Sequence, residues 1–81
     1  MADYIATFFT HYDAMQFKRR LEKAGAEGTM CPVPRWLSSS CGTCVRFSFS
    51  CERIGELQGS EMERLVQVTE DQQYQDIIDN R

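Results

Sequence analysis

A short segment rich in cysteine, serine and proline carries the residue types best suited to chemistry. It runs from Cys31 to Cys44 and reads Cys-Pro-Val-Pro-Arg-Trp-Leu-Ser-Ser-Ser-Cys-Gly-Thr-Cys. Small hydroxyl residues before a Cys-Gly pair can present backbone N–H groups and hydroxyls around one point, which makes an anion-binding concavity. Hydrogen-bond donors and positive charges near a thiol favour the thiolate, the nucleophilic form. We therefore expect Cys41 to be the reactive cysteine.

The residues expected to stabilise negative charge at Cys41 lie on both sides of it in the sequence. The arginines would supply positive charge, while the serines and the glycine would supply hydrogen-bond donors. A plain polar loop with an inert cysteine is the alternative interpretation. The stabilising set is Arg35, Ser38, Ser39, Ser40, Gly42 and Arg46.

Cys41 and Cys44 also form a Cys-x-x-Cys pair, Cys-Gly-Thr-Cys. This spacing suits a reversible disulfide or two ligands of a metal site. In thioredoxin-like proteins the first cysteine of such a pair lies at a helix N-terminus, whereas a strand is expected here. We predict that Cys44 resolves a species held on Cys41. The alternative is that Cys44 is only a small residue of the strand.

The spacing of the other cysteines disfavours structural zinc. Cys31 lies ten residues before Cys41, and Cys51 lies seven after Cys44, which matches common zinc modules poorly. The chain has one histidine, His11, at the start of an expected helix. We therefore predict neither a metal nor another cofactor.

Cys31 begins a second motif, Cys-Pro-x-Pro. Small sulfur-relay proteins of the TusA type hold a persulfide on such a motif at the start of their first long helix. Here the motif follows an expected strand and no long helix comes next. We interpret Cys31 as a strand-end residue, and a second sulfur carrier at Cys31 is the alternative.

Hydrophobic periodicity predicts the elements that would position these residues. Thr10 suits the N-cap of a helix over His11–Ala24, which has an apolar stripe at spacings of three and four. The expected strands are Tyr4–Phe9, Gly28–Val33, Thr43–Ser50 and Met62–Val68, and the other expected helices are Cys51–Gln58 and Asp71–Asn80.

This order of elements is β-α-β-β-α-β followed by a helix, which matches the ferredoxin-like split βαβ arrangement. We therefore predict an α+β fold with a four-stranded antiparallel sheet and an added C-terminal helix. Leu65 and Val66 would point to opposite faces of the last strand, and both are apolar. The second face of the sheet is thus expected to lie under the terminal helix or another subunit.

Length and composition restrict the class of protein. The chain has 81 residues, 42% hydrophobic and 26% charged, which fits one soluble domain over residues 1–81. Its net charge of −3 argues against an extended nucleic-acid or membrane surface. The first residues lack the basic region of a signal peptide, and no apolar run reaches the ~20 residues that span a bilayer. We expect a cytoplasmic protein, where thiols stay reduced.

Several segments together resemble a known bacterial family. They are Phe-Thr-His-Tyr-Asp-Ala, the helix end Lys-Ala-Gly, Pro-Val-Pro-Arg, and Ser-Ser-Ser-Cys-Gly before a strand with Arg46 and Phe47. The chain resembles short domains described as selenium/sulfur carrier-like, closely in its first part and loosely beyond. The resemblance implies that Cys41 is the key thiol. It also places four other residues in the signature, namely Arg35, Ser39, Ser40 and Gly42.

We therefore predict a sulfur or selenium carrier that holds a persulfide or selenosulfide on Cys41 and exchanges it with protein partners. The residues leave open whether it also turns over a substrate as an enzyme. One alternative is a non-catalytic interaction module, for example a homodimer. The other is a small thiol–disulfide redox protein using Cys41 and Cys44. Neither nucleic acid nor a membrane is expected as a partner.

Overall fold

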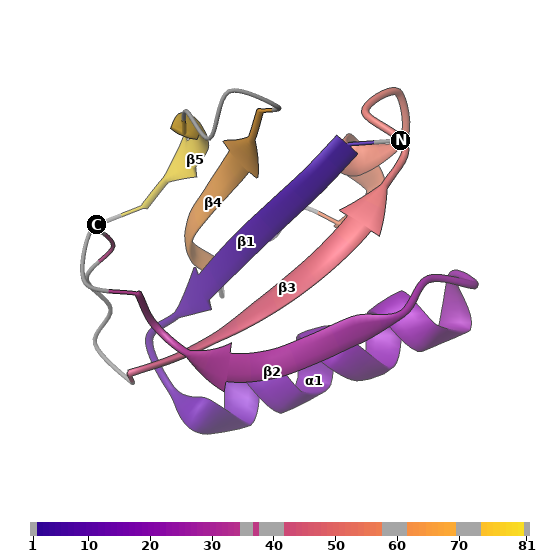
Figure 1. Ribbon diagram of the computed structural model, residues 1–81. Coiled ribbons are helices and arrows are strands. Elements are labelled where there is room, and N and C mark those ends of the chain that lie inside the picture. The colour runs from indigo at the N-terminus through magenta and orange to yellow at the C-terminus, as the bar shows by residue number, and fades with distance from the viewer. Residues whose placement is uncertain (1, 35–36, 38–41, 58–61, 70–73, 81) are drawn as a thin grey trace.

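The computed structural model describes residues 2–34, 37, 42–57, 62–69 and 74–80. The strands form a five-stranded antiparallel sheet in the order β2-β3-β1-β4-β5, and α1 lies behind β2 in the view of Figure 1. The elements in chain order are β1 (Ala2–Phe8), α1 (His11–Lys23), β2 (Gly28–Pro32), β3 (Thr43–Phe49), a 3₁₀ helix (Ile54–Leu57), β4 (Met62–Val68) and β5 (Tyr74–Asp79).

The helix α1 forms where its local signals predict it. Thr10 has an extended backbone, and its hydroxyl oxygen accepts a hydrogen bond from the Asp13 N–H at 3.1 Å. Ala14, Phe17 and Leu21 share one face and are buried. No helix in the described part of the chain is long and apolar enough to cross a membrane.

The main core lies between α1 and the sheet, and aromatic rings occupy its centre. The Phe17 ring lies 5.2 Å from that of Phe8 and 5.4 Å from that of Phe47. Tyr4 stacks on Phe47 at 5.5 Å. Because these rings come from α1, β1 and β3, their contacts fix the helix against the middle of the sheet.

The first half of the chain is a split βαβ unit. β3 pairs antiparallel with both β1 and β2, so β1 and β2 run parallel and are connected through α1. β2 lies at one edge of the sheet, and Pro32 is its last residue. An edge strand tolerates proline because one side of its backbone has no strand to pair with. The cysteine-rich segment therefore leaves the sheet at the end of β2 and returns at the start of β3.

The predicted α+β class is confirmed, but two predicted helices are wrong. A helix was expected over Cys51–Gln58, but the described residues 51–57 form only a turn and the 3₁₀ helix. In the segment expected as the helix Asp71–Asn80, Tyr74–Asp79 forms the strand β5 instead. The described residues thus form one α-helix and five strands, not the two-helix, four-stranded ferredoxin-like pattern with an added helix.

Pairing with β4 explains why the terminal segment is extended. The Arg64 guanidinium makes a two-pronged ion pair with the Asp76 carboxylate across the two strands. The Asn80 backbone N–H donates to the Glu63 carbonyl, and its side-chain amide donates to the Met62 carbonyl, both at 2.9 Å. These contacts join residues that are distant in sequence, and they outweigh the helix-like spacing of the apolar residues in the terminal segment.

The N-cap of α1 gives a direct test of the observed helix start. Replacing Thr10 by Ala removes the acceptor for the Asp13 N–H and is expected to lower the free energy of unfolding by about 1 kcal/mol. Thr10→Ser keeps a hydroxyl and should stay close to the parent. Urea unfolding followed by circular dichroism measures both. Equal stability of the Ala and Ser variants would contradict the capping assignment.

Candidate functional site

The sheet face opposite α1 has a small apolar cluster of its own. Ile5, Leu37, Cys44 and Val66 are buried in it, and Leu37 is only 1% exposed. Leu37 belongs to the segment between β2 and β3, so this segment covers part of the second face. Val66 was expected to lie under a terminal helix or another subunit. It packs in a cluster that includes Leu37 of its own chain. Cover of this face by a second subunit, as in a homodimer, stays a prediction.

Backbone hydrogen bonds fix the described parts of the segment between β2 and β3. The Val33 N–H donates to the Gly42 carbonyl at 3.2 Å, which extends the β2–β3 pairing by one residue pair. The Leu37 N–H donates to the Pro34 carbonyl at 3.0 Å. Gly42 has a φ of 73°, a left-handed conformation that suits glycine. The loop is therefore closed at its two ends and held down at Leu37.

Cys31 and Cys44 face each other across β2 and β3. They are register partners, and their Sγ atoms lie 3.4 Å apart. Cys44 is fully buried, and its Sγ also lies 3.7 Å from the Pro32 carbonyl oxygen. Cys31 is partly exposed. Two thiols at this distance are close enough to interact, and an oxidant could join them in a disulfide after a small side-chain rotation.

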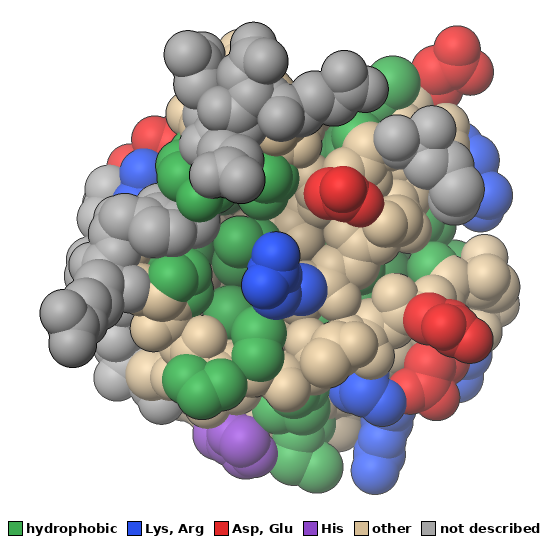
Figure 2. Space-filling view, viewed as in Figure 1, with side chains coloured by type: hydrophobic (Ala, Val, Ile, Leu, Met, Phe, Trp, Pro, Cys, Tyr) green, Lys and Arg blue, Asp and Glu red, His purple; other side chains and the backbone are tan. Residues whose placement is uncertain are grey.

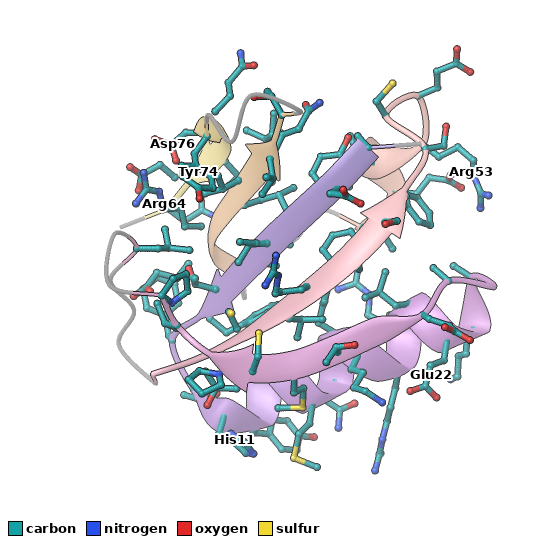
Figure 3. All side chains as sticks on the ribbon, viewed as in Figure 1. His11, Glu22, Arg53, Arg64, Tyr74 and Asp76 are labelled. Atoms are coloured by element: carbon teal, nitrogen blue, oxygen red, sulfur yellow. The ribbon has the colours of Figure 1, made fainter. Side chains whose placement is uncertain are left out.

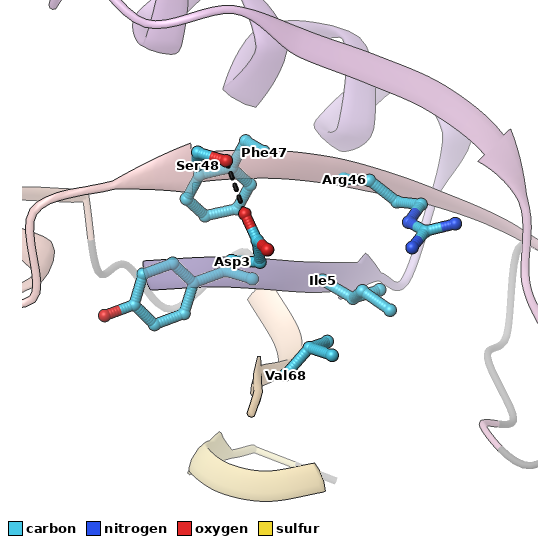
Figure 4. A pocket seen from close by; sticks show the side chains of 7 residues that line it. Asp3, Ile5, Arg46, Phe47, Ser48 and Val68 are labelled. Atoms are coloured by element: carbon cyan, nitrogen blue, oxygen red, sulfur yellow. Dashed lines mark hydrogen bonds between the residues drawn. The ribbon is translucent and has the colours of Figure 1, made fainter. Parts of the chain in front are cut away.

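Arg46 lies on the same face of β3 as Cys44 and is exposed. With Asp3, Ile5 and Val68 it lines a hollow of about 230 Å³ (Figure 4). The Ser48 hydroxyl donates a hydrogen bond to the Asp3 carboxylate beside it. Figure 2, which views the molecule in the same orientation as Figure 1, shows a basic side chain near the centre of the face, with hydrophobic side chains on one side of it. The hollow thus combines a cation, a carboxylate and apolar surface.

The structure places three of the predicted site residues and leaves the others undescribed. Cys44, Gly42 and Arg46 lie at or near the end of β3 from which the loop leaves. The predicted residues that lie outside the described part of the chain are Cys41, Arg35, Ser38, Ser39 and Ser40. Their predicted roles remain predictions.

Sequence reasoning missed two residues of this site. Cys31 was interpreted as a strand-end residue, and its pairing with Cys44 was not predicted. An antiparallel pairing of the two strands brings these cysteines together in one register only, and the sequence did not select that register. Leu37 was passed over as a loop residue. The signal for it was an apolar side chain followed by three serines.

Two ionisable side chains among the described residues have shifted pKa values, and each shift has a local cause. A hydrogen bond from Lys18, with the attraction of its charge, lowers the pKa of Glu22 on the surface of α1. Burial, and to a lesser extent the negative charge of Cys51, raises the pKa of Tyr4. Figure 3 shows His11 at the N-terminal end of α1. Among the described residues, no three histidine, cysteine or acidic side chains come together as metal ligands would.

A family model described as "Putative Se/S carrier protein-like" matches residues 3–75. The chain belongs to this family. The match covers α1, all but the first residue of the first four strands, and the whole segment between Cys31 and Cys44. It confirms the resemblance that the cysteine-rich segment and the first helix indicated. No curated protein and no solved structure gives a significant match.

The cover that Leu37 provides for Cys44 can be tested with a mild substitution. Leu37→Val removes one methylene group and should cost about 1 kcal/mol in this cluster. If the loop opens locally, Cys44 should be alkylated about fivefold faster, because a free-energy change of that size multiplies an opening equilibrium by that factor. Mass spectrometry of the alkylated peptide measures the rate.

Leu57→Val is the matched control, because Leu57 is buried in the main core on the other side of the sheet. Leu57→Val should lower the free energy of unfolding by a similar amount, but it should not raise the alkylation rate of Cys44 comparably. Equal acceleration in the two variants would mean that Cys44 is exposed only by global unfolding.

Proposed function

We propose that this protein carries sulfur or selenium, held as a persulfide or selenosulfide on Cys41, and passes it between protein partners. The observation that carries the proposal is membership of the Se/S carrier-like family over residues 3–75, a range that contains Cys41 and its neighbouring residues. The description of the family suggests transfer, and a transferred atom needs a donor and an acceptor. Protein partners are therefore part of the proposal.

The described ends of the loop support a preorganised site. Gly42 follows Cys41 directly, and its carbonyl is bonded to the Val33 N–H. Leu37, four residues before Cys41, is buried against the sheet. A segment tied on both sides loses less entropy when it forms an ordered anion site. Arg35 and the serines at 38–40 are proposed to stabilise the charge on sulfur, and Arg46 to add positive potential on the sheet.

The loading step is a transfer between two sulfur centres. The Cys41 thiolate attacks the outer sulfur of a donor persulfide, and the sulfur–sulfur bond of the donor breaks. The donor cysteine leaves as a thiolate and takes up a proton, while Cys41 becomes a persulfide. The step requires no metal and no net change in oxidation state across the two proteins.

Loading with a cysteine desulfurase and cysteine tests this proposal. Intact-mass analysis should show the parent protein gaining the mass of one sulfur atom, which a thiol reductant removes. Cys41→Ser should gain none. Cys51→Ser is the matched control, because Cys51 is exposed and lies beyond the other end of β3, and it should load like the parent. Loading of the Cys41→Ser variant at the parental level would exclude Cys41 as the carrier.

The backbone at Gly42 gives a second test of the same loop. Gly42→Ala places a side chain in a left-handed conformation and is expected to cost about 1–2 kcal/mol. The cost is conformational, because an added Cβ would meet nothing within 4 Å. Sulfur loading should slow in this variant, since the backbone next to Cys41 would shift to relieve the strain.

Gly55→Ala is the control, because Gly55 has no positive φ and its Cβ would also meet nothing within 4 Å. It should leave stability and loading close to the parental values. Normal loading and stability in Gly42→Ala would show that the left-handed backbone is not needed for the site.

A further inference from the structure

The geometry points to Cys31 and Cys44 as a redox-active dithiol that reduces disulfides of low-molecular-weight thiols and closes into a cross-strand disulfide. This activity is separate from carriage on Cys41 and does not rest on it. The pair differs from the Cys41–Cys44 pair that the Cys-x-x-Cys spacing suggested. The inference rests on three observations: the register of β2 against β3, the distance between the two Sγ atoms, and the unequal burial of Cys31 and Cys44.

The register of β2 and β3 permits a disulfide at this pair. The hydrogen bond from the Val33 N–H to the Gly42 carbonyl marks residues 33 and 42 as a hydrogen-bonded pair. Such pairs recur every second residue along an antiparallel ladder, so Cys31 and Cys44 form one as well. Their Cα atoms are then about 5.5 Å apart, which is the usual separation in disulfides.

The sulfur atoms need only a small movement to bond. They are 3.4 Å apart, and a disulfide bond is about 2.0 Å long. Cys31 lies near the end of the edge strand β2, so rotation of its side chain requires no change in the centre of the sheet. Cys51 cannot take its place, because roughly 17 Å of extended strand separate Cys44 from Phe49 and Cys51 follows Phe49.

Unequal burial assigns a different role to each thiol. Cys31 is partly exposed and can meet a dissolved disulfide. Cys44 is fully buried, packed with Ile5, Leu37 and Val66, so a bulky reagent does not reach it. Cys31 is therefore the attacking thiol, and Cys44 is the thiol that resolves the mixed disulfide.

The exchange takes two steps and balances without another reactant. The Cys31 thiolate attacks one sulfur of the disulfide RSSR, which forms a Cys31–SR bond and releases RS⁻. Cys44 then gives up its proton, and its thiolate attacks the Sγ atom of Cys31 and releases the second RS⁻. Both RS⁻ ions take up the two protons that the protein thiols lost. Two protein thiols are oxidised, and one disulfide is reduced to two thiols.

The test uses the full chain with Cys41→Ser and Cys51→Ser, so that only the proposed pair remains. Incubated with oxidised glutathione, this protein should lose the mass of two hydrogen atoms and keep no glutathione. Peptide mapping should then find Cys31 joined to Cys44. Because Cys41 is absent from this variant, the result does not depend on whether Cys41 carries sulfur. If no disulfide forms between Cys31 and Cys44, the proposal of sulfur carriage on Cys41 is not affected.

Two added substitutions separate the roles of the thiols. With Cys44→Ala, which keeps a small apolar side chain in the cluster, glutathione should stay on Cys31 as a stable mixed disulfide. With Cys31→Ala, the buried Cys44 should gain neither glutathione nor a disulfide. A folded protein that keeps both thiols, or that keeps glutathione on Cys31 while Cys44 is present, would overturn the inference. Circular dichroism verifies that each variant is folded.

Discussion

Burial of Leu37 on the sheet face opposite α1 is the contact on which the cysteine-rich segment depends. In the described residues, one α-helix covers one face of a five-stranded sheet. The other face presents Ile5 and Val66, and apolar side chains on a sheet need a second layer. Leu37 supplies part of that layer from the connection between β2 and β3. The segment between β2 and β3 thus contributes to the fold.

This arrangement couples packing to thiol chemistry. Cys44 belongs to the apolar cluster under Leu37 and also faces Cys31 across the two strands. Any opening of the loop therefore changes the access of reagents to a buried thiol. The proposed carriage on Cys41 and the proposed exchange at Cys31 and Cys44 make different demands on the site. The first needs donors and charge around an accessible thiolate, whereas the second needs another thiol within bonding reach.

Local signals predicted the first half of the fold well and the second half poorly. The N-cap at Thr10 and the apolar stripe of α1 act within a few residues, so the helix was predictable. The spacing of Tyr74, Ile77 and Ile78 is also compatible with a strand that contains an irregularity, and such a register shift occurs opposite, between Leu65 and Val66. Pairing with β4 decided between the two structures, and that pairing is not local.

The sequence by itself determined the candidate chemistry. The cysteines, the serine run and the glycine favour thiol chemistry, and together with the first helix they indicated the family that the comparison shows. Only the tertiary structure decided that Cys31 faces Cys44 and that Leu37 is buried in the same cluster as Cys44. Both contacts depend on the register of β2 against β3, because a slip of one residue would turn each side chain to the other face. That register follows from simultaneous packing on both faces of the sheet, which no short stretch of sequence encodes.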